Sequence, residues 1–155
     1  GRNCVLRTIE NGFFIFWELD PARGKVRQLS IVQQVPSILG GWGLSADGMR
    51  VAIPIHDRNE ARLRVLANGA DTVTDVELPG LSALRSVHWA SDGKGWYVTT
   101  ERHLKSSLYY VEASGASHLL REIDGASWGI PSPDGKLLAF VDYVQGLGGW
   151  LFDRD

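Results

Sequence analysis

Short segments with alternating apolar and polar residues run through the whole chain, separated by turns rich in glycine, aspartate and asparagine. Alternation with a period of two is typical of β-strands, because successive side chains point to opposite faces. The pattern predicts three strands, then two sets of four, then a last incomplete set. The expected strands are 4–9, 13–19 and 26–30; 39–45, 50–56, 61–67 and 72–78; 84–90, 95–100, 107–113 and 117–122; and finally a strand from 126, then 137–141 and 149–152.

One phrase recurs at the start of each set, with copies at residues 42–48, 87–93 and 128–135. Its aspartates, Asp47, Asp92 and Asp134, stand 45 and then 42 residues apart. That period is typical of a four-stranded propeller blade, which stacks on its neighbours to bury its faces. The predicted fold class is therefore all-β, a partial β-propeller of about three and a half four-stranded antiparallel blades. The blades would span residues 1–38 (partial), 39–80, 81–124 and 125–155 (incomplete).

Closed propellers usually have about four to eight blades, so we expect this chain to be one arc of a larger ring. The chain starts without a methionine and opens within the strand pattern, which also predicts a piece of a longer protein.

Each repeat places an Asp-Gly pair between its first and second strands. Hairpin turns need positive φ, which Asp-Gly meets at low cost, and the aspartate can accept bonds from nearby backbone amides. Metal ligation is the alternative role, but a calcium site needs six or more oxygens from one locality, and these aspartates fall in separate blades. We expect turns, with no metal and no cofactor.

The segment 57–69 leaves two structures open. Asp57 to Glu60 matches a helix capping box. However, Ala61, Leu63 and Val65 alternate with arginines at period two, which favours a strand.

Composition and charge argue against nucleic-acid binding and against a membrane-spanning segment. The net charge of −2 comes with scattered basic residues, whereas nucleic-acid binding requires a basic stripe. No apolar stretch is long enough to span a bilayer, and no signal peptide is recognisable. Cys4 is the single cysteine, so we expect no internal disulfide, and its apolar neighbours predict a buried position.

Gly125-Ala126-Ser127-Trp128-Gly129 matches the Gly-x-Ser-x-Gly nucleophile elbow. An elbow needs a helix after the serine, and the two prolines at 131 and 133 exclude one. In hydrolases of that fold an acid and then a histidine follow the serine, but the last histidine here is His118. In the repeat alignment, Trp128-Gly129 matches Trp42-Gly43 as an inner strand. We therefore expect no catalytic residues.

Blade geometry selects the candidate ligand-binding residues. Alternate side chains of inner strands can face the central channel, while loops between second and third strands share one face of the ring. Most of the six tryptophans recur at repeat positions, where we expect them to wedge between blades. The candidates are Trp42, His88 and Trp128 on inner strands and His56, Asp57, Arg58, Arg102 and His103 at the loops.

The segments 45–53, 90–98 and 132–140 share the pattern (Ser/Ala)-x-Asp-Gly-(Lys/Met)-x-x-(Ala/Tyr)-(Ile/Val/Phe). It resembles the PD40, or WD40-like, repeat of TolB-type propellers, best in the third copy. The first two copies have Ala46 and Ser91 in place of the proline. The chain is also similar to the C-terminal propellers of bacterial proteins with a serine/threonine kinase or winged-helix domain and a membrane span. That resemblance implies an extracytoplasmic sensor, and segment 148–152 resembles the last strand of such chains, implying a C-terminus nearby.

These observations predict a non-catalytic binding or sensory module whose partner is a protein or peptide. A gating propeller of a prolyl-oligopeptidase-like peptidase is one alternative. The other is a structural platform that self-associates through open blade edges.

Overall fold

The computed structural model describes residues 4–33, 41–57, 60–67, 72–102, 105–143 and 147–153. For residues 56, 57, 60, 126, 127, 141–143 and 147–153 it describes the backbone. The described residues form fourteen strands and no helix, so the all-β prediction is confirmed. Among these residues, none lies in a helix long and apolar enough to cross a membrane.

The strands form four antiparallel sheets, each following the chain order. The first sheet contains β1 (Cys4–Glu10), β2 (Phe13–Asp20) and β3 (Gly24–Gln33). The second contains β4 (Gly43–Leu44), β5 (Arg50–Asp57), β6 (Glu60–Ala67) and β7 (Val73–Leu78). The third contains β8 (Leu84–Trp89), β9 (Gly95–Arg102), β10 (Lys105–Glu112) and β11 (Ser117–Asp124). The fourth contains β12 (Ala126–Pro131), β13 (Leu137–Tyr143) and β14 (Leu147–Asp153).

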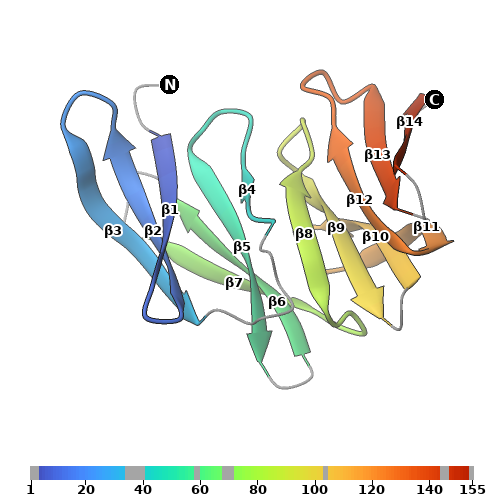
Figure 1. The fold of residues 1–155 in the computed structure, drawn as a ribbon, viewed down its shortest axis with the longest axis horizontal. Coiled ribbons are helices and arrows are strands. Elements are labelled where there is room, and N and C mark those ends of the chain that lie inside the picture. Colours follow the sequence, from blue (N-terminus) through green and yellow to red (C-terminus); the bar gives the residue numbers. More distant parts are fainter. Residues whose placement is uncertain are drawn as a thin grey trace.

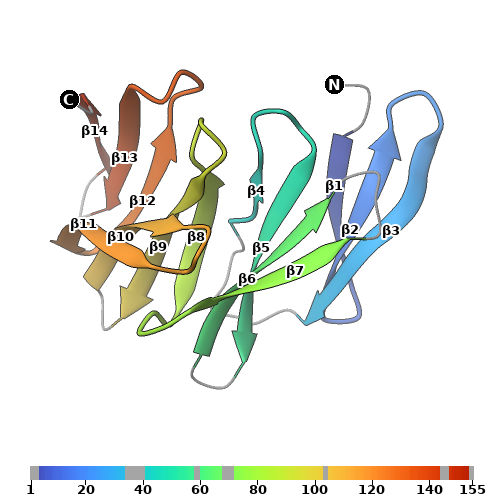
Figure 2. The same cartoon turned by 180° about the vertical axis from the view of Figure 1, so that it is seen from behind.

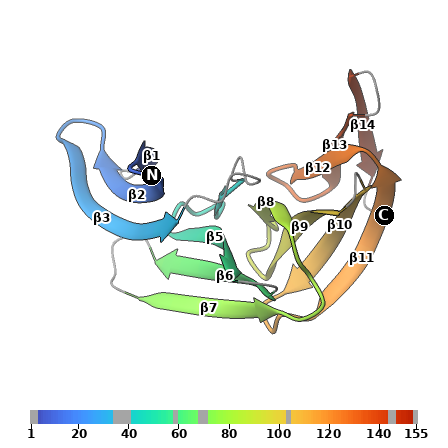
Figure 3. The ribbon, with the colours of Figure 1, turned by 60° about the horizontal axis from the view of Figure 1, so that its bottom comes forward.

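The sheets stand side by side in an open arc, with β3, β7 and β11 on its convex side (Figure 3). The Asp-Gly turns lie together at one edge of the arc, and the β7–β8 connection lies at the opposite edge (Figure 1 and Figure 2). This arrangement is a partial propeller, and the sheets are its blades.

Apolar side chains fill the seams between neighbouring sheets. The seam between the second and third sheets is the largest cluster and contains Leu63, Val87 and Val98, all fully buried. In this seam Trp89 and Trp96 pack with ring centroids 5.0 Å apart. The prediction that repeated tryptophans wedge between blades is confirmed for this pair.

The Asp-Gly turns have the predicted geometry. In the first turn Ser45 Oγ donates to Asp47 Oδ1 at 2.5 Å, and the Met49 amide donates to the same oxygen at 2.9 Å. These bonds lower the pKa of Asp47, the serine bond contributing most. Gly48 takes a positive φ of 71°. Glycine adopts this φ without a steric penalty, so the turn role of the pair is confirmed.

Within the segment over which helix and strand competed, residues 60–67 form the strand β6. β6 pairs with β5 and β7 along its length. The alternating arginines face acidic residues across the sheet, with Arg64 Nη2 2.8 Å from Asp75 Oδ2. Arg62 Nη1 lies 4.0 Å from the same oxygen. Cross-strand pairing satisfies a period-two pattern that a helix would have scattered around its surface.

Two predictions are wrong. Cys4 is exposed, because it begins β1 at the edge of the first sheet. The inner strand expected over 39–45 is limited among the described residues to β4 and Gly41. Gly41 instead pairs with β8: its amide donates to Arg85 O at 3.3 Å, and the Val87 amide donates to Gly41 O at 2.9 Å. Gly41 is therefore hydrogen-bonded to the third sheet, while β4, which follows it, belongs to the second.

Candidate binding site

The two tryptophans predicted to line the channel project from opposite faces of their own sheets. Trp42 packs edge-to-face against Phe16 of β2, with ring centroids 5.7 Å apart, in the seam between the first and second sheets. Trp128 is 39% exposed. A Cβ on its neighbour Gly129 would meet Leu108 of the third sheet, so alternation turns Trp128 to the opposite, open face of the fourth sheet. The structure does not bring the two indoles together.

The backbone register explains this difference. Ser45, Ala90 and Ser132 occupy the same turn position, because each amide donates to the carbonyl that ends the hairpin, at 2.9, 2.9 and 2.8 Å. Counting back from them, Trp42 corresponds to Gly129, so the alignment of Trp128-Gly129 with Trp42-Gly43 is wrong by one residue. A shift of one residue sends a strand side chain to the other face.

His88 lies on β8, half-buried. Val87 and Trp89 on either side of it belong to the seam with the second sheet, so alternation turns His88 towards the fourth sheet. Burial lowers its pKa, since desolvation disfavours the imidazolium ion. Its imidazole is therefore neutral near pH 7.

The loop-face candidates lie at the ends of second strands. His56 and Asp57 end β5, where the structure describes their backbone. Arg58 and His103 lie outside the described residues. Arg102 ends β9, and its exposed side chain lines two hollows in the surface.

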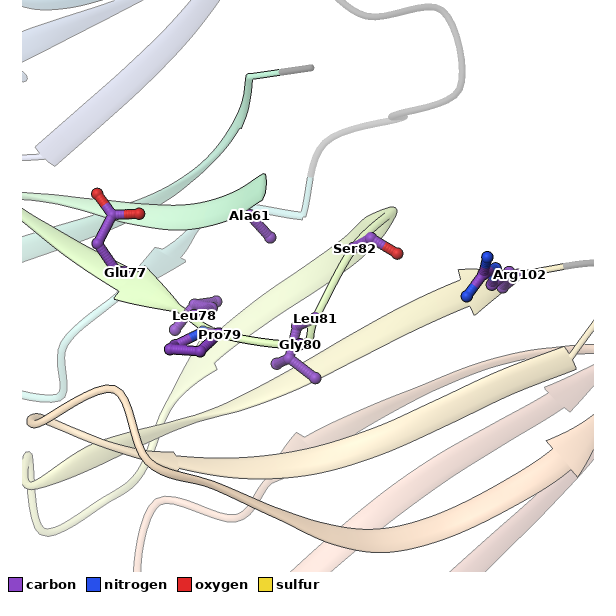
Figure 4. Close-up of a pocket in the computed structure, with 8 residues that line it drawn as sticks. All are labelled: Ala61, Glu77, Leu78, Pro79, Gly80, Leu81, Ser82 and Arg102. Carbon is purple, nitrogen blue, oxygen red and sulfur yellow. The ribbon is translucent and has the colours of Figure 1, made fainter. Parts of the chain in front are cut away.

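The two hollows share lining residues at the β7–β8 connection, and Figure 4 shows the residues that line the larger one. The larger has a volume of about 800 Å³ and the smaller about 510 Å³. They share Gly80, Leu81, Ser82 and Arg102. The larger extends to Ala61, Glu77, Leu78 and Pro79, and the smaller to Thr100, Lys105, Ser107, Tyr109 and Glu122. Arg102 thus reaches both spaces from the end of β9.

Two buried leucines hold the connection in place. Leu78 is 2% exposed and Leu81 is 6% exposed, and both belong to the core of the neighbouring seam. The Leu81 amide donates to Leu78 O at 3.1 Å across the Pro79-Gly80 turn, where Gly80 has a φ of 79°. The hollows are therefore walled by a loop fixed to the core, which favours a preformed site.

The backbone after this turn is strained. Ala83 has a φ of 51°, which is uncommon for a residue with a side chain. Its carbonyl accepts from the Glu101 amide at 3.0 Å, and the register of β8 against β9 shifts between Leu84 and Ser86. Strain and bulges of this kind are over-represented next to functional sites.

Sequence reasoning selected Arg102 but missed the connection from Leu78 to Ser82. Its signal was the Pro79-Gly80 dipeptide directly after an expected strand, which marks a turn. The dipeptide does not predict that the two neighbouring leucines anchor the turn, or that the turn lies next to Arg102. Both features depend on the packing of two blades.

Comparison with known proteins identifies the fold. No protein-family model matches the chain, and neither does the sequence of any curated protein. TolB from Acinetobacter baumannii superposes with a TM-score of 0.76 and 16% identity, over 98% of this chain and 38% of that one. A protein assigned as TolB from Agrobacterium tumefaciens superposes with a TM-score of 0.77 and 19% identity, over 99% of this chain and 58% of that one. The chain thus has the TolB-type propeller fold and spans less than two thirds of either protein.

A prolyl endopeptidase superposes less well, with a TM-score of 0.60 and 18% identity. The match covers 99% of this chain and 28% of the endopeptidase. Likeness at these identities establishes the fold, which hosts many functions.

Proposed function

We propose that the chain is a non-catalytic binding module of a larger bacterial protein, and that it recognises a protein or peptide at the two hollows beside the β7–β8 connection. The observation that carries this proposal is that the hollows adjoin. Each has a volume within the usual range of ligand sites, about 300–1,000 Å³, and they share four lining residues.

The lining supports binding rather than a reaction. Lys105 Nζ lies 3.6 Å from Glu122 Oε1, and Arg62 Nη1 lies 3.9 Å from Glu77 Oε1. Both of these carboxylates are thus already engaged by a cation of their own sheet. Hydroxyl groups of Ser82, Thr100 and Ser107 add hydrogen-bonding capacity, and the Ser107 Oγ donates to Glu122 Oε2 at 3.4 Å.

Panning a phage-displayed library of random peptides against the chain tests the location. We expect enriched peptides to bind Ser82→Trp at least about tenfold more weakly, because the indole would fill the space shared by both hollows. Lys105→Trp, on the exposed rim of the smaller hollow, is a second blocking variant. Ser91→Trp, at the opposite edge of the arc, is the matched control.

Unchanged binding to both blocking variants would move the site elsewhere. The double variant His88→Ala/Trp128→Ala then tests the inner strands, and loss of affinity there with retained folding would assign the ligand to them. Circular dichroism of every variant separates lost binding from lost structure.

A gating propeller of a prolyl-oligopeptidase-like peptidase is the second candidate, favoured by the match to a prolyl endopeptidase. The DNA that flanks the reading frame distinguishes the two. A kinase or winged-helix domain with a membrane span upstream supports a sensory module, whereas a hydrolase domain in the same frame supports the gate.

A further inference from the structure

The carboxylates around the hollows are each held by a cation of their own sheet. The distances are 3.9 Å from Arg62 Nη1 to Glu77 Oε1, 2.7 Å from Arg85 Nη2 to Glu101 Oε1, and 3.6 Å from Lys105 Nζ to Glu122 Oε1. Arg102 lines both hollows and has no ion-pair partner among the described residues. Its sequence neighbour Glu101 is already engaged by Arg85. Arg102 is therefore a cation of the described site that is open to an anionic ligand.

We propose that Arg102 holds a single carboxylate of an extended peptide that lies across the two hollows. The carboxylate is either the C-terminal group of the peptide or the side chain of an aspartate or glutamate. A guanidinium presents two parallel N–H donors that match the two carboxylate oxygens, which gives direction as well as charge. This inference rests on the proposed function.

Two hydroxyl groups line the smaller hollow together with Arg102. Thr100 can donate to a ligand, whereas the Ser107 Oγ donates to Glu122 Oε2 at 3.4 Å. Thr100 and Ser107 are both 8% exposed and pair with each other across β9 and β10. Arg102 pairs with Lys105 on the same two strands, two residues further along. Side chains two apart share a face of the sheet, so these four residues form one polar surface beneath the connection.

The charge of the site selects a singly charged group. Glu77 lines the larger hollow and Glu122 the smaller, so each space carries a carboxylate besides the guanidinium. Glu77 is paired with Arg62 and Glu122 with Lys105, which leaves the guanidinium of Arg102 as the unpaired charge of the described lining. A carboxylate matches that single charge, whereas a doubly charged phosphate would leave one negative charge without a cation.

Titration of the ¹⁵N-labelled chain, followed by NMR, tests the proposal with four probes. They are acetyl-tetraalanine with a free C-terminus, acetyl-Ala-Asp-Ala-Ala-amide, acetyl-tetraalanine amide, and inorganic phosphate. We expect one or both carboxylate peptides to shift the Arg102 Nε signal and the amides of residues 80–82. The neutral amide and phosphate should shift them at least about tenfold less at equal concentration. The peptide that binds identifies the source of the carboxylate.

Arg102→Gln should weaken that binding by about tenfold to a hundredfold, the effect of losing a charge-assisted bond. Arg102→Lys keeps the positive charge but loses the two parallel N–H donors of the guanidinium, so its affinity should lie between those of the parent and Arg102→Gln. The matched control is Arg23→Gln in the turn between β2 and β3, where the arginine side chain is 85% exposed, and this variant should bind as the parent does.

Equal shifts by the neutral amide, or unchanged binding by Arg102→Gln, would overturn carboxylate recognition. Equal or larger shifts by phosphate would overturn the selection for a single charge. If neither carboxylate peptide causes shifts, carboxylate recognition by Arg102 is likewise overturned. In each case the proposed function is judged separately. It stands if peptides from panning still lose affinity for Ser82→Trp, and it is overturned together with the role of Arg102 if they do not.

Discussion

The seam between the second and third sheets and the seam between the third and fourth come from the same repeat, yet their chemistry differs. In the first seam Trp89 packs on Trp96, and its Nε1 donates to Gly43 O at 3.2 Å. The second seam is a smaller cluster that includes Tyr97, Leu108 and Phe140.

The second seam also receives polar groups. Ser86 and Thr99 pair across β8 and β9, and both hydroxyls are buried without a hydrogen-bond partner in the part of the chain that the structure describes. His88 faces the same seam. Among the described residues the first seam holds one buried polar atom without a partner, Trp96 Nε1, against the two hydroxyls in the second, and its apolar cluster is larger. A buried polar atom without a partner costs free energy that apolar packing must offset, so the first seam contributes more to stability than the second.

Removing an indole from the first seam should cause the largest loss of stability. Trp89→Ala should lower the free energy of unfolding by about 3–5 kcal/mol, because it opens a cavity and leaves Gly43 O without its donor. Trp128→Ala, on the open face of the fourth sheet, should cost less than about 1 kcal/mol. Urea denaturation of both variants measures the difference, and similar losses would contradict a large contribution of Trp89 to the first seam.

Adding a methyl group tests how closely the sheets approach. A Cβ at Gly43 would lie 2.8 Å from Val87 O and 3.2 Å from His88 Cα, both backbone atoms. Gly43→Ala should therefore destabilise the chain by about 2–3 kcal/mol.

At Gly129, in the second seam, the same methyl would meet the Leu108 Cδ atoms at 3.2 and 3.3 Å. A leucine side chain can move, so Gly129→Ala should cost less than about 1 kcal/mol. The two midpoints in a urea titration decide the point: a Gly129 variant as unstable as the Gly43 variant would mean that both seams are equally rigid.

Removing a buried hydroxyl should change the free energy of unfolding in opposite directions at Thr99 and Ser107. Thr99→Val removes a hydroxyl without a described partner and should be neutral or stabilising by up to about 1 kcal/mol. Ser107 is similarly buried, but its Oγ donates to Glu122 Oε2 at 3.4 Å. Ser107→Ala should destabilise by about 1 kcal/mol. A destabilised Thr99 variant would show that its hydroxyl has a partner in the seam.

The sequence predicted the strands and turns because their signals are local. Period-two alternation and the Asp-Gly pairs located every strand to within a few residues, apart from the short β4. It did not predict that Gly41 leaves its own sheet to pair with β8, since that depends on how two blades meet. The exposure of Cys4 likewise follows from its place at a sheet edge rather than from its apolar neighbours.

The candidate site was harder to predict because register decides which face a side chain takes. The third repeat has one more residue between its tryptophan and its aspartate than the first, and that residue turns Trp128 away from the face used by Trp42. Blade geometry did select Arg102, because the end of a second strand is a local feature. Its position beside the Leu78–Ser82 connection required the packing of both sheets.

His88 should make the second seam sensitive to acid. Its pKa is lowered by burial, so below the ordinary value of about 6.5 the unfolded chain binds a proton that the folded chain resists. Its contribution to stability is therefore present above pH 6.5 and is lost as the pH falls through the lowered pKa. Urea denaturation between pH 7.5 and 5 should show this loss in the parent and a smaller one in His88→Gln. If His88→Gln loses stability with pH as steeply as the parent, the acid sensitivity arises outside the second seam.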